Sequence, residues 1–220
     1  KGASRRILER FGGGEIDVLV GTQMITKGYD FPNVTLVGVI AADASLGFPD
    51  FRAAERTFQL LCQVAGRAGR GPKPGRVLVQ TFNPGHYAVA SARTHDYPAF
   101  FRQEVELRRL LGYPPFAYLA CIRVQGRRRE AAERAARRLG KGMEEIRKGT
   151  RGARSGIRVL GPVEAPIARI QGRFRWQILV KGARAEALHR FLAQVEELSE
   201  RLFRDAGVQV STDVDPYQML

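Results

Sequence analysis

The residues best suited to chemistry in this sequence are two arginines and a glutamine between Gln63 and Arg70. Arg67 and Arg70 directly follow Gly66 and Gly69. Glycine lets the backbone approach another group closely, so we expect both arginines to project from a defined turn. A planar guanidinium presented in this way can bind a phosphate through two parallel hydrogen bonds. The alternative is a basic helix end, where arginines bind carbonyl groups and meet the negative end of the helix dipole.

A second stretch with the features of a phosphate site lies upstream, at residues 21–30 (Gly-Thr-Gln-Met-Ile-Thr-Lys-Gly-Tyr-Asp). It follows residues 16–20, a β-branched run that predicts a buried strand. A strand leading into a glycine, a hydroxyl, a second glycine and a carboxylate is the layout of a nucleotide site at the carboxyl end of an α/β sheet. Thr22, Gly28 and Asp30 are the candidate residues of this stretch.

These two stretches together resemble motifs V and VI of superfamily 2 helicases. Further landmarks follow in order along the chain, at residues 42–56, 112–116, 160–163, 173–179 and 213–216. With these landmarks the chain resembles the C-terminal portion of the PriA family, also called primosomal protein N′, of bacterial replication-restart helicases. The resemblance implies an ATP-dependent 3′ to 5′ DNA helicase that recognises stalled replication forks and initiates primosome assembly.

The resemblance also implies roles for individual residues. Arg67 and Arg70 would reach the γ-phosphate of ATP with Mg²⁺ as arginine fingers, with Gln63 beside it. Gly28 and Asp30 would approach the ribose. The sequence contains no Gly-x-x-x-x-Gly-Lys-Ser/Thr phosphate loop, so we expect this chain alone not to hydrolyse ATP.

Zinc and partners are further implications of the resemblance. The zinc clusters of the family would lie upstream of Lys1. Cys62 and Cys121 are the two cysteines of this chain, and both read as core residues, so we predict no metal site here. The implied partners are forked and single-stranded DNA, the tail of the single-stranded-DNA-binding protein, other primosome proteins and the machinery that loads the replicative helicase. We expect no membrane segment and a cytoplasmic, nucleoid-associated protein.

A net charge of +14 over 220 residues also points to a polyanionic partner. Residues 1–97 hold 12 Lys and Arg against 8 Asp and Glu, and residues 98–220 hold 24 against 14, so the net charges are +4 and +10. The candidate DNA contacts are Thr22 by resemblance, and Arg128, Arg134, Arg138, Arg173 and Arg175 by charge. Arg184 is a candidate partner contact. If residues 173–176 form a strand, its two aromatic residues face the core and its two arginines face the surface.

The order of apolar patterns predicts an α/β fold in two parts. Residues 1–97 read as the C-terminal part of a RecA-like helicase lobe with a parallel sheet, residues 98–115 as a connecting helix and proline corner, and residues 116–220 as a small α+β domain with the split βαβ order. The predicted strands are residues 16–20, 35–41, 76–82, 117–125, 157–162, 173–181 and 208–213. The predicted helices are residues 4–11, 51–65, 98–111, 128–148 and 184–204.

Two other classes of function stay open at this point. The strongly basic second half also fits a fork-binding assembly platform that loads partner proteins without unwinding DNA. The split βαβ order occurs in RNA-binding proteins as well, which leaves a ribosome- or RNA-associated module as a third hypothesis.

Overall fold

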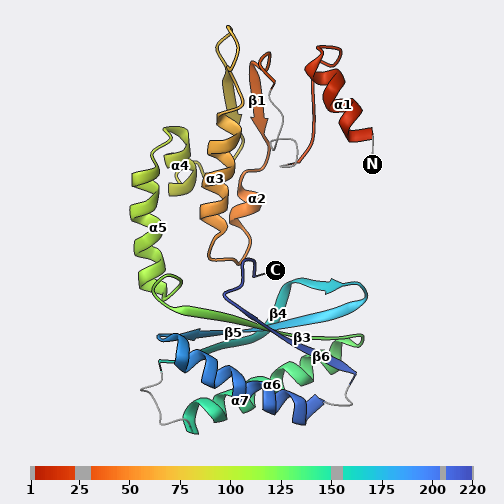
Figure 1. Cartoon of the computed structure of the whole chain (residues 1–220), viewed down its shortest axis with the longest axis vertical. Coiled ribbons are helices and arrows are strands. Elements are labelled where there is room, and N and C mark those ends of the chain that lie inside the picture. Colours follow the sequence, from red (N-terminus) through yellow and green to blue (C-terminus); the bar gives the residue numbers. More distant parts are fainter. Residues whose placement is uncertain (1–2, 23–30, 150–155, 204–206, 220) are drawn as a thin grey trace. The chain divides into compact units, whose positions relative to one another are not determined.

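The computed structural model of the chain describes residues 3–22, 31–149, 156–203 and 207–219 (Figure 1). It divides into two compact units, one made of Lys1–Phe48 and Arg52–Glu104, the other of Pro49–Phe51 and Val105–Leu220. The division falls inside helix α5 (Tyr97–Leu111). The domain boundaries expected at residues 97 and 115 stay a prediction.

The first unit contains a parallel pair of strands connected through helices. β1 (Leu36–Val39) pairs with β2 (Arg76–Val79) from Leu36 opposite Arg76 to Val39 opposite Val79. The helices of this unit, besides the start of α5, are α1 (Ala3–Gly12), α2 (Asp43–Leu46), α3 (Ala53–Ala65) and α4 (Tyr87–Arg93). Two parallel strands with helices between them confirm the α/β class expected of this half.

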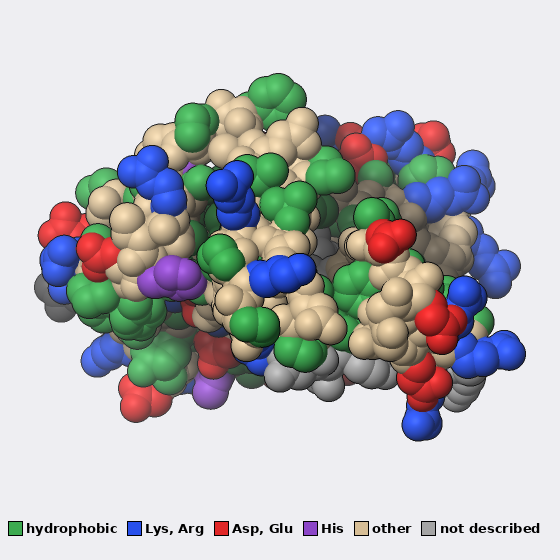
Figure 2. All heavy atoms as spheres, turned by 90° about the horizontal axis from the view of Figure 1, so that it is seen from above, with side chains coloured by type: hydrophobic (Ala, Val, Ile, Leu, Met, Phe, Trp, Pro, Cys, Tyr) green, Lys and Arg blue, Asp and Glu red, His purple; other side chains and the backbone are tan. Residues whose placement is uncertain are grey.

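The strand expected at residues 16–20 is wrong. The structure assigns no strand to this segment, and the side chains of Val18 and Val20 are 74% and 84% exposed. A continuous apolar run becomes a buried strand only where neighbouring strands and helices cover it, and the exposure of Val18 and Val20 shows that these side chains are not covered. Hydrophobic side chains lie open at the surface in the view of Figure 2.

Helix α3 begins at Ala53 instead of residue 51, and its buried face is shifted from the predicted one. Phe58 and Leu61 are buried as expected, but Ala54, Cys62 and Ala65 are only partly covered. The buried residues of the helix are Ala53, Thr57, Phe58, Leu61 and Val64. Phe51 precedes the helix and stacks on the Tyr113 ring with 4.9 Å between ring centroids, in the second unit.

The second unit has the predicted β-α-β-β-α-β order. Its elements are β3 (Tyr118–Gly126), α6 (Arg129–Gly149), β4 (Arg158–Ile170), β5 (Arg173–Gly182), α7 (Ala185–Phe203) and β6 (Val208–Val214). The strands form one sheet in the order β4-β5-β3-β6, and every neighbouring pair is antiparallel. This is the split βαβ arrangement, and the predicted fold class is confirmed.

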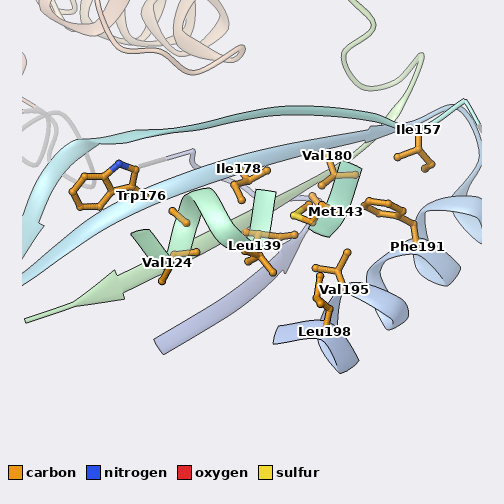
Figure 3. Close-up of a cluster of buried hydrophobic side chains, with 14 of the residues drawn as sticks. Val124, Leu139, Met143, Ile157, Trp176, Ile178, Val180, Phe191, Val195 and Leu198 are labelled. Carbon is orange, nitrogen blue, oxygen red and sulfur yellow. The ribbon is translucent and has the colours of Figure 1, made fainter. Parts of the chain in front are cut away.

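The core of the second unit lies between the sheet and the two helices, which cover the same face of the sheet (Figure 1). Apolar side chains from α6 and α7 meet those of the central strands in Figure 3. They include Val124, Leu139, Met143, Trp176, Ile178, Val180, Phe191 and Val195. The helical stripes predicted at i, i+3 and i+4 spacing are therefore the buried faces of both helices.

Strand β4 is longer than the predicted residues 157–162, because it continues through two prolines to Ile170. Register irregularities lie between Leu160 and Val163 and between Glu164 and Arg169. Prolines are tolerated at an edge strand and at bulges, and β4 is an edge strand of this sheet. Within the described ranges, no helix combines the length and the hydropathy that crossing a membrane requires.

Candidate functional site

The three candidate catalytic residues lie at and just after the C-terminal end of α3. The side chains of Gln63 and Arg70 are exposed, and that of Arg67 is partly covered. Nε of Arg70 donates a hydrogen bond to the backbone oxygen of Gly66 at 2.8 Å. This is the carbonyl-binding arrangement of a basic helix end, and it gives the Arg70 guanidinium a defined direction.

The loop after α3 is fixed by close backbone contacts at its glycines. Gly69 donates its backbone N–H to the oxygen of Val34 at 3.0 Å, and its φ of +72° lies in the left-handed region. A Cβ at Gly69 would lie 2.6 Å from the nitrogen of Gly75, and one at Gly71 would meet the oxygen of Pro32. The glycines therefore allow the close approach that the sequence predicts.

These contacts place residues 66–71, the arginine loop, beside residues 31–34, which follow the second candidate stretch in the chain. Of the candidate residues in that stretch, the structure describes Thr22, and the Thr22 side chain is exposed. Gly28 and Asp30 lie outside the described residues. The roles of these residues at a nucleotide or at DNA stay predictions.

Asp43 is a residue of this region that sequence reasoning missed. Its carboxylate accepts hydrogen bonds from Oγ1 of Thr81 and from the backbone N–H of Phe82, both at 2.7 Å. These bonds, the one from Thr81 first, hold the pKa of Asp43 below its ordinary value. Asp43 thus ties α2 to the segment that leaves β2. A carboxylate just after the apolar run at 36–41 was the signal that could have indicated it.

The outward face of α6 carries the largest set of exposed cations in the second unit. Arg137 forms an ion pair with Glu133, and Arg129 forms one with Glu164. Three exposed arginines have no ion pair in the part of the chain that the structure describes. They are Arg128, just before α6, and Arg134 and Arg138, on α6 itself. A row of exposed arginines suits contact with a phosphate backbone.

The two arginines of β5 differ from each other. Arg173 is partly exposed, but Arg175 is buried, with 7% of its surface exposed, so the expectation of two surface arginines is wrong for Arg175. The Arg175 side chain lies under the β4–β5 hairpin, where Nη1 donates to the backbone oxygen of Ile167 at 3.4 Å. Burial first, and then the nearby Arg123, lowers the pKa of Arg175. The aromatic partners Phe174 and Trp176 face the core as expected.

Arg184, the candidate partner contact, is exposed just before α7. Its backbone oxygen accepts the N–H of Leu188 at 3.1 Å, which makes it part of the first turn of the helix. The backbone of Arg184 is therefore held in place by the helix, and its exposed side chain extends from that position.

Two family models match the chain and define its class. A family model described as helicase conserved C-terminal domain matches residues 1–72, and one described as primosomal protein N C-terminal domain matches residues 109–217. The first match covers α3 and the arginine loop up to Gly71. The chain therefore combines a helicase C-terminal segment with a second, separate domain.

Curated relatives identify the particular family. The replication restart protein PriA of Bacillus subtilis is 44% identical over 220 residues, that of Synechocystis is 41% identical over 216, and that of Treponema pallidum is 39% identical over 219. These alignments cover 98–100% of the chain and 25–32% of the relatives. The chain belongs to the PriA family of replication restart proteins, and it spans about a quarter to a third of the length of these relatives.

Proposed function

We propose that this chain is the C-terminal part of an ATP-dependent 3′ to 5′ DNA helicase that recognises stalled replication forks and initiates primosome assembly. The observation that carries the proposal is the loop after α3, which presents Arg67 and Arg70 beside residues 31–34. The match of the helicase model to this segment supports the same role.

The proposed chemistry follows from the charge that develops during phosphoryl transfer. ATP with Mg²⁺ supplies the transferred group when the nucleotide is bound. Arg67 and Arg70 would stabilise the negative charge on that group, and a positioned arginine accelerates such a step by roughly 10³ to 10⁵. The exposed Gln63 stands less than one turn of helix before Gly66 and would lie beside the γ-phosphate. The glycine contacts of the loop would hold the arginines in place before the reaction. A charge that is already in position stabilises the developing negative charge better than a mobile one does.

The remaining assignments of the second candidate stretch belong to the same proposal. Gly28 and Asp30 would meet the ribose, and Thr22 would contact a DNA phosphate. The chain alone would not hydrolyse ATP, because its sequence has no phosphate-binding loop with a lysine. Zinc would be bound by the whole protein and not by this chain.

The proposed partners follow from replication restart. They are forked and single-stranded DNA, the tail of the single-stranded-DNA-binding protein with Arg184 as a contact, other primosome proteins, and the machinery that loads the replicative helicase. The protein would act in the cytoplasm at the nucleoid. The exposed arginines of α6 support a DNA-facing role for the second unit.

The test uses the whole protein that contains this chain, with fork-stimulated ATP hydrolysis and unwinding as the measurements. We expect Arg70→Ala to lower hydrolysis by about 10³-fold or more while fork binding is kept. Arg93→Ala, which removes an exposed arginine from the end of α4, is the matched control and should leave hydrolysis unchanged. An Arg70→Ala protein with normal hydrolysis would rule out the arginine-finger role.

A second function has one observation in its favour. The bond from Arg70 to the oxygen of Gly66 is an ordinary way to end a helix and needs no nucleotide. The protein would then be a fork-binding platform that loads partner proteins without unwinding. In that case the unaltered protein binds forks and assembles partners but shows no fork-stimulated hydrolysis.

A further inference from the structure

Three residues that stand directly before α3 in the chain belong by their packing to the second unit. Pro49–Phe51 forms one compact unit with Val105–Leu220, while the flanking residues Phe48 and Arg52 belong to the first unit. Helix α3 begins at Ala53, and the arginine loop follows its last residue. The second unit therefore holds the backbone just before the helix that leads to the candidate catalytic arginines.

Asp50 is the charged residue of this three-residue segment, and it is buried. Its exposed fraction is 8%, and its Oδ2 accepts a hydrogen bond from the backbone N–H of Met219 at 3.2 Å. Met219 is 2% exposed, and the two residues lie 169 positions apart in the chain. A buried carboxylate is costly unless donors satisfy it, and hydrogen bonds to an ionised group are stronger than those to a neutral one. This bond therefore constrains where Asp50 lies.

The segment after β6, which supplies this N–H, is itself anchored. Asp215 donates its backbone N–H to the oxygen of Leu119 at 2.8 Å, and its φ of +50° turns the chain at the end of β6. The backbone oxygen of Gln218 accepts a hydrogen bond from Nη2 of Arg123 at 3.2 Å. Both partners lie on β3, so residues 215–219 are attached to a central strand of the sheet.

The ring of Phe51 is held in the same unit. It stacks on Tyr113 with 4.9 Å between the ring centroids and 8° between the ring planes, and the Arg108 guanidinium lies 5.1 Å from the centroid of the Phe51 ring. Burial first, and then the charge of the nearby Asp50, raises the pKa of Tyr113. Stacking and cation–π contacts thus add to the hydrogen bond that holds Asp50.

These contacts set where α3 begins, and the arginine loop follows where α3 ends. A helix of 13 residues is about 20 Å long and behaves as a rigid element, so a displacement of its start displaces its end. The buried face of α3 also packs in the core of the first unit, so a lost contact at Asp50 shifts the helix and does not release it. A misplacement of about 1 Å at a reacting group lowers a rate by roughly 100-fold.

We propose that Asp50 is a positioning residue for ATP hydrolysis, because its bond to Met219 fixes the start of α3 and thereby the place of Arg67 and Arg70. Asp50 acts through the helix and does not touch the nucleotide. The inference rests on the proposed function, since it concerns the same reaction. It gives the second unit a part in hydrolysis, because the residues that hold Asp50 belong to that unit.

The experiment measures fork-stimulated ATP hydrolysis by the whole protein that contains this chain. Asp50→Ala removes the acceptor of the Met219 N–H, and Asp50→Asn keeps an oxygen that can accept it. Phe51→Leu loosens the same segment through a different contact, and it serves as the test if Asp50→Ala does not fold. Asp96→Ala is the matched control, because Asp96 also accepts a backbone N–H, from Ala99 at 2.9 Å, but in the first unit.

We expect Asp50→Ala to lower kcat by roughly 10- to 100-fold and to leave KM for ATP and fork affinity unchanged, because a misplaced arginine loses an interaction of the transition state. Asp50→Asn should recover most of the loss, and Asp96→Ala should keep the original kcat. In an Arg70→Ala background, Asp50→Ala should lower kcat by less than about twofold further, since residues that act as a unit are not additive.

Hydrogen exchange of the complete 220-residue chain gives a readout that does not depend on hydrolysis. The backbone N–H groups of Gly66, Arg67 and Gly69 are hydrogen-bonded in the arginine loop. We expect Asp50→Ala to speed their exchange, and Asp96→Ala to leave it unchanged. Faster exchange confined to residues 49–53 would show that the disturbance stops before the arginine loop, and it would overturn the positioning role.

The kinetic outcomes separate this inference from the proposed function. If Arg70→Ala loses hydrolysis while folded Asp50→Ala and Phe51→Leu keep it, the inference fails alone and the proposed function stands. An equal loss from Asp50→Ala with and without Arg70 would also overturn the inference, because Asp50 would then act by another route. If Arg70→Ala keeps hydrolysis, the proposed function fails and the positioning role fails with it.

Discussion

Nζ of Lys181 lies 3.4 Å from the centroid of the Tyr113 ring and donates a hydrogen bond to the backbone oxygen of Leu111 at 2.9 Å. Tyr113 also stacks on Phe51, and the Arg108 guanidinium lies 5.1 Å from the centroid of the Phe51 ring. These four residues form one cluster. Two cations thus flank two stacked rings within the second unit. Lys181 is 7% exposed, and burial lowers its pKa.

The cluster should contribute a measurable coupling energy. We expect Lys181→Met and Tyr113→Leu each to destabilise the chain, since each removes the cation–π contact. The double variant should lose about 1 kcal/mol less than the sum of the two single losses. Urea unfolding of the four proteins measures this difference, and additive losses would show that the contact between lysine and ring is energetically neutral.

Gly69 should tolerate no side chain. A Cβ there meets the Gly75 nitrogen, and the left-handed φ is strained for alanine, so Gly69→Ala should cost about 1 to 3 kcal/mol in the free energy of unfolding. Gly85→Ala is the matched control, because a Cβ at Gly85 meets nothing within 4 Å. The measurement is thermal or urea unfolding of both variants. Equal stability of the two variants would contradict the close packing of the arginine loop.

The carboxylate of Asp43 should make part of the stability depend on acid pH. Its folded pKa lies below the ordinary 3.8, so the stabilisation is present above that value and is lost as pH falls through the folded pKa. Asp43→Asn keeps the shape but weakens both charge-assisted bonds. We expect the difference in unfolding free energy between the variant and the unaltered chain to be constant near neutral pH and to shrink below pH 3.8. A difference that persists in acid would show that the charge is not involved.

The core of the second unit should be sensitive to lost volume. Leu139 is fully buried between α6 and the sheet, so Leu139→Ala should cost about 2 to 5 kcal/mol in unfolding free energy. Leu110→Ala removes the same atoms from a side chain that is 81% exposed and should cost less than about 0.5 kcal/mol. Urea unfolding compares the two, and similar losses would contradict the packing shown in Figure 3.

The second unit could be predicted from sequence almost completely, because its helices are long and amphipathic and its strands lie between clear turn signals. The stripe that contains Leu139 and Met143 predicted the buried face of α6 directly. The elements of the first unit were harder to predict from the sequence than those of the second unit. Its strands are four residues long, and α2 and α4, which are four and seven residues long, are too short to show a helical period.

The roles of the candidate site residues stay predictions, and their surroundings could not be predicted from the sequence. Gln63, Arg67 and Arg70 come from a local pattern, and the glycine turn was expected. The burial of Arg175 depends on the backbone of Ile167, eight residues away, and on a hairpin longer than its prolines suggested. The neighbours of Arg123 and Gln125 depend on the strand register, which the sequence of each strand alone does not specify.

The shortness of the β1–β2 pair has a consequence for the arginine loop. A pair of four-residue strands is marginal on its own, and the side chains of Leu36 and Leu78 are largely exposed. We therefore expect the amide protons of β1 and β2 to exchange with deuterium well before those of α3, whose buried face packs on Phe100. The arginine loop would then move with the helix that precedes it, while the strand beside it opens and closes.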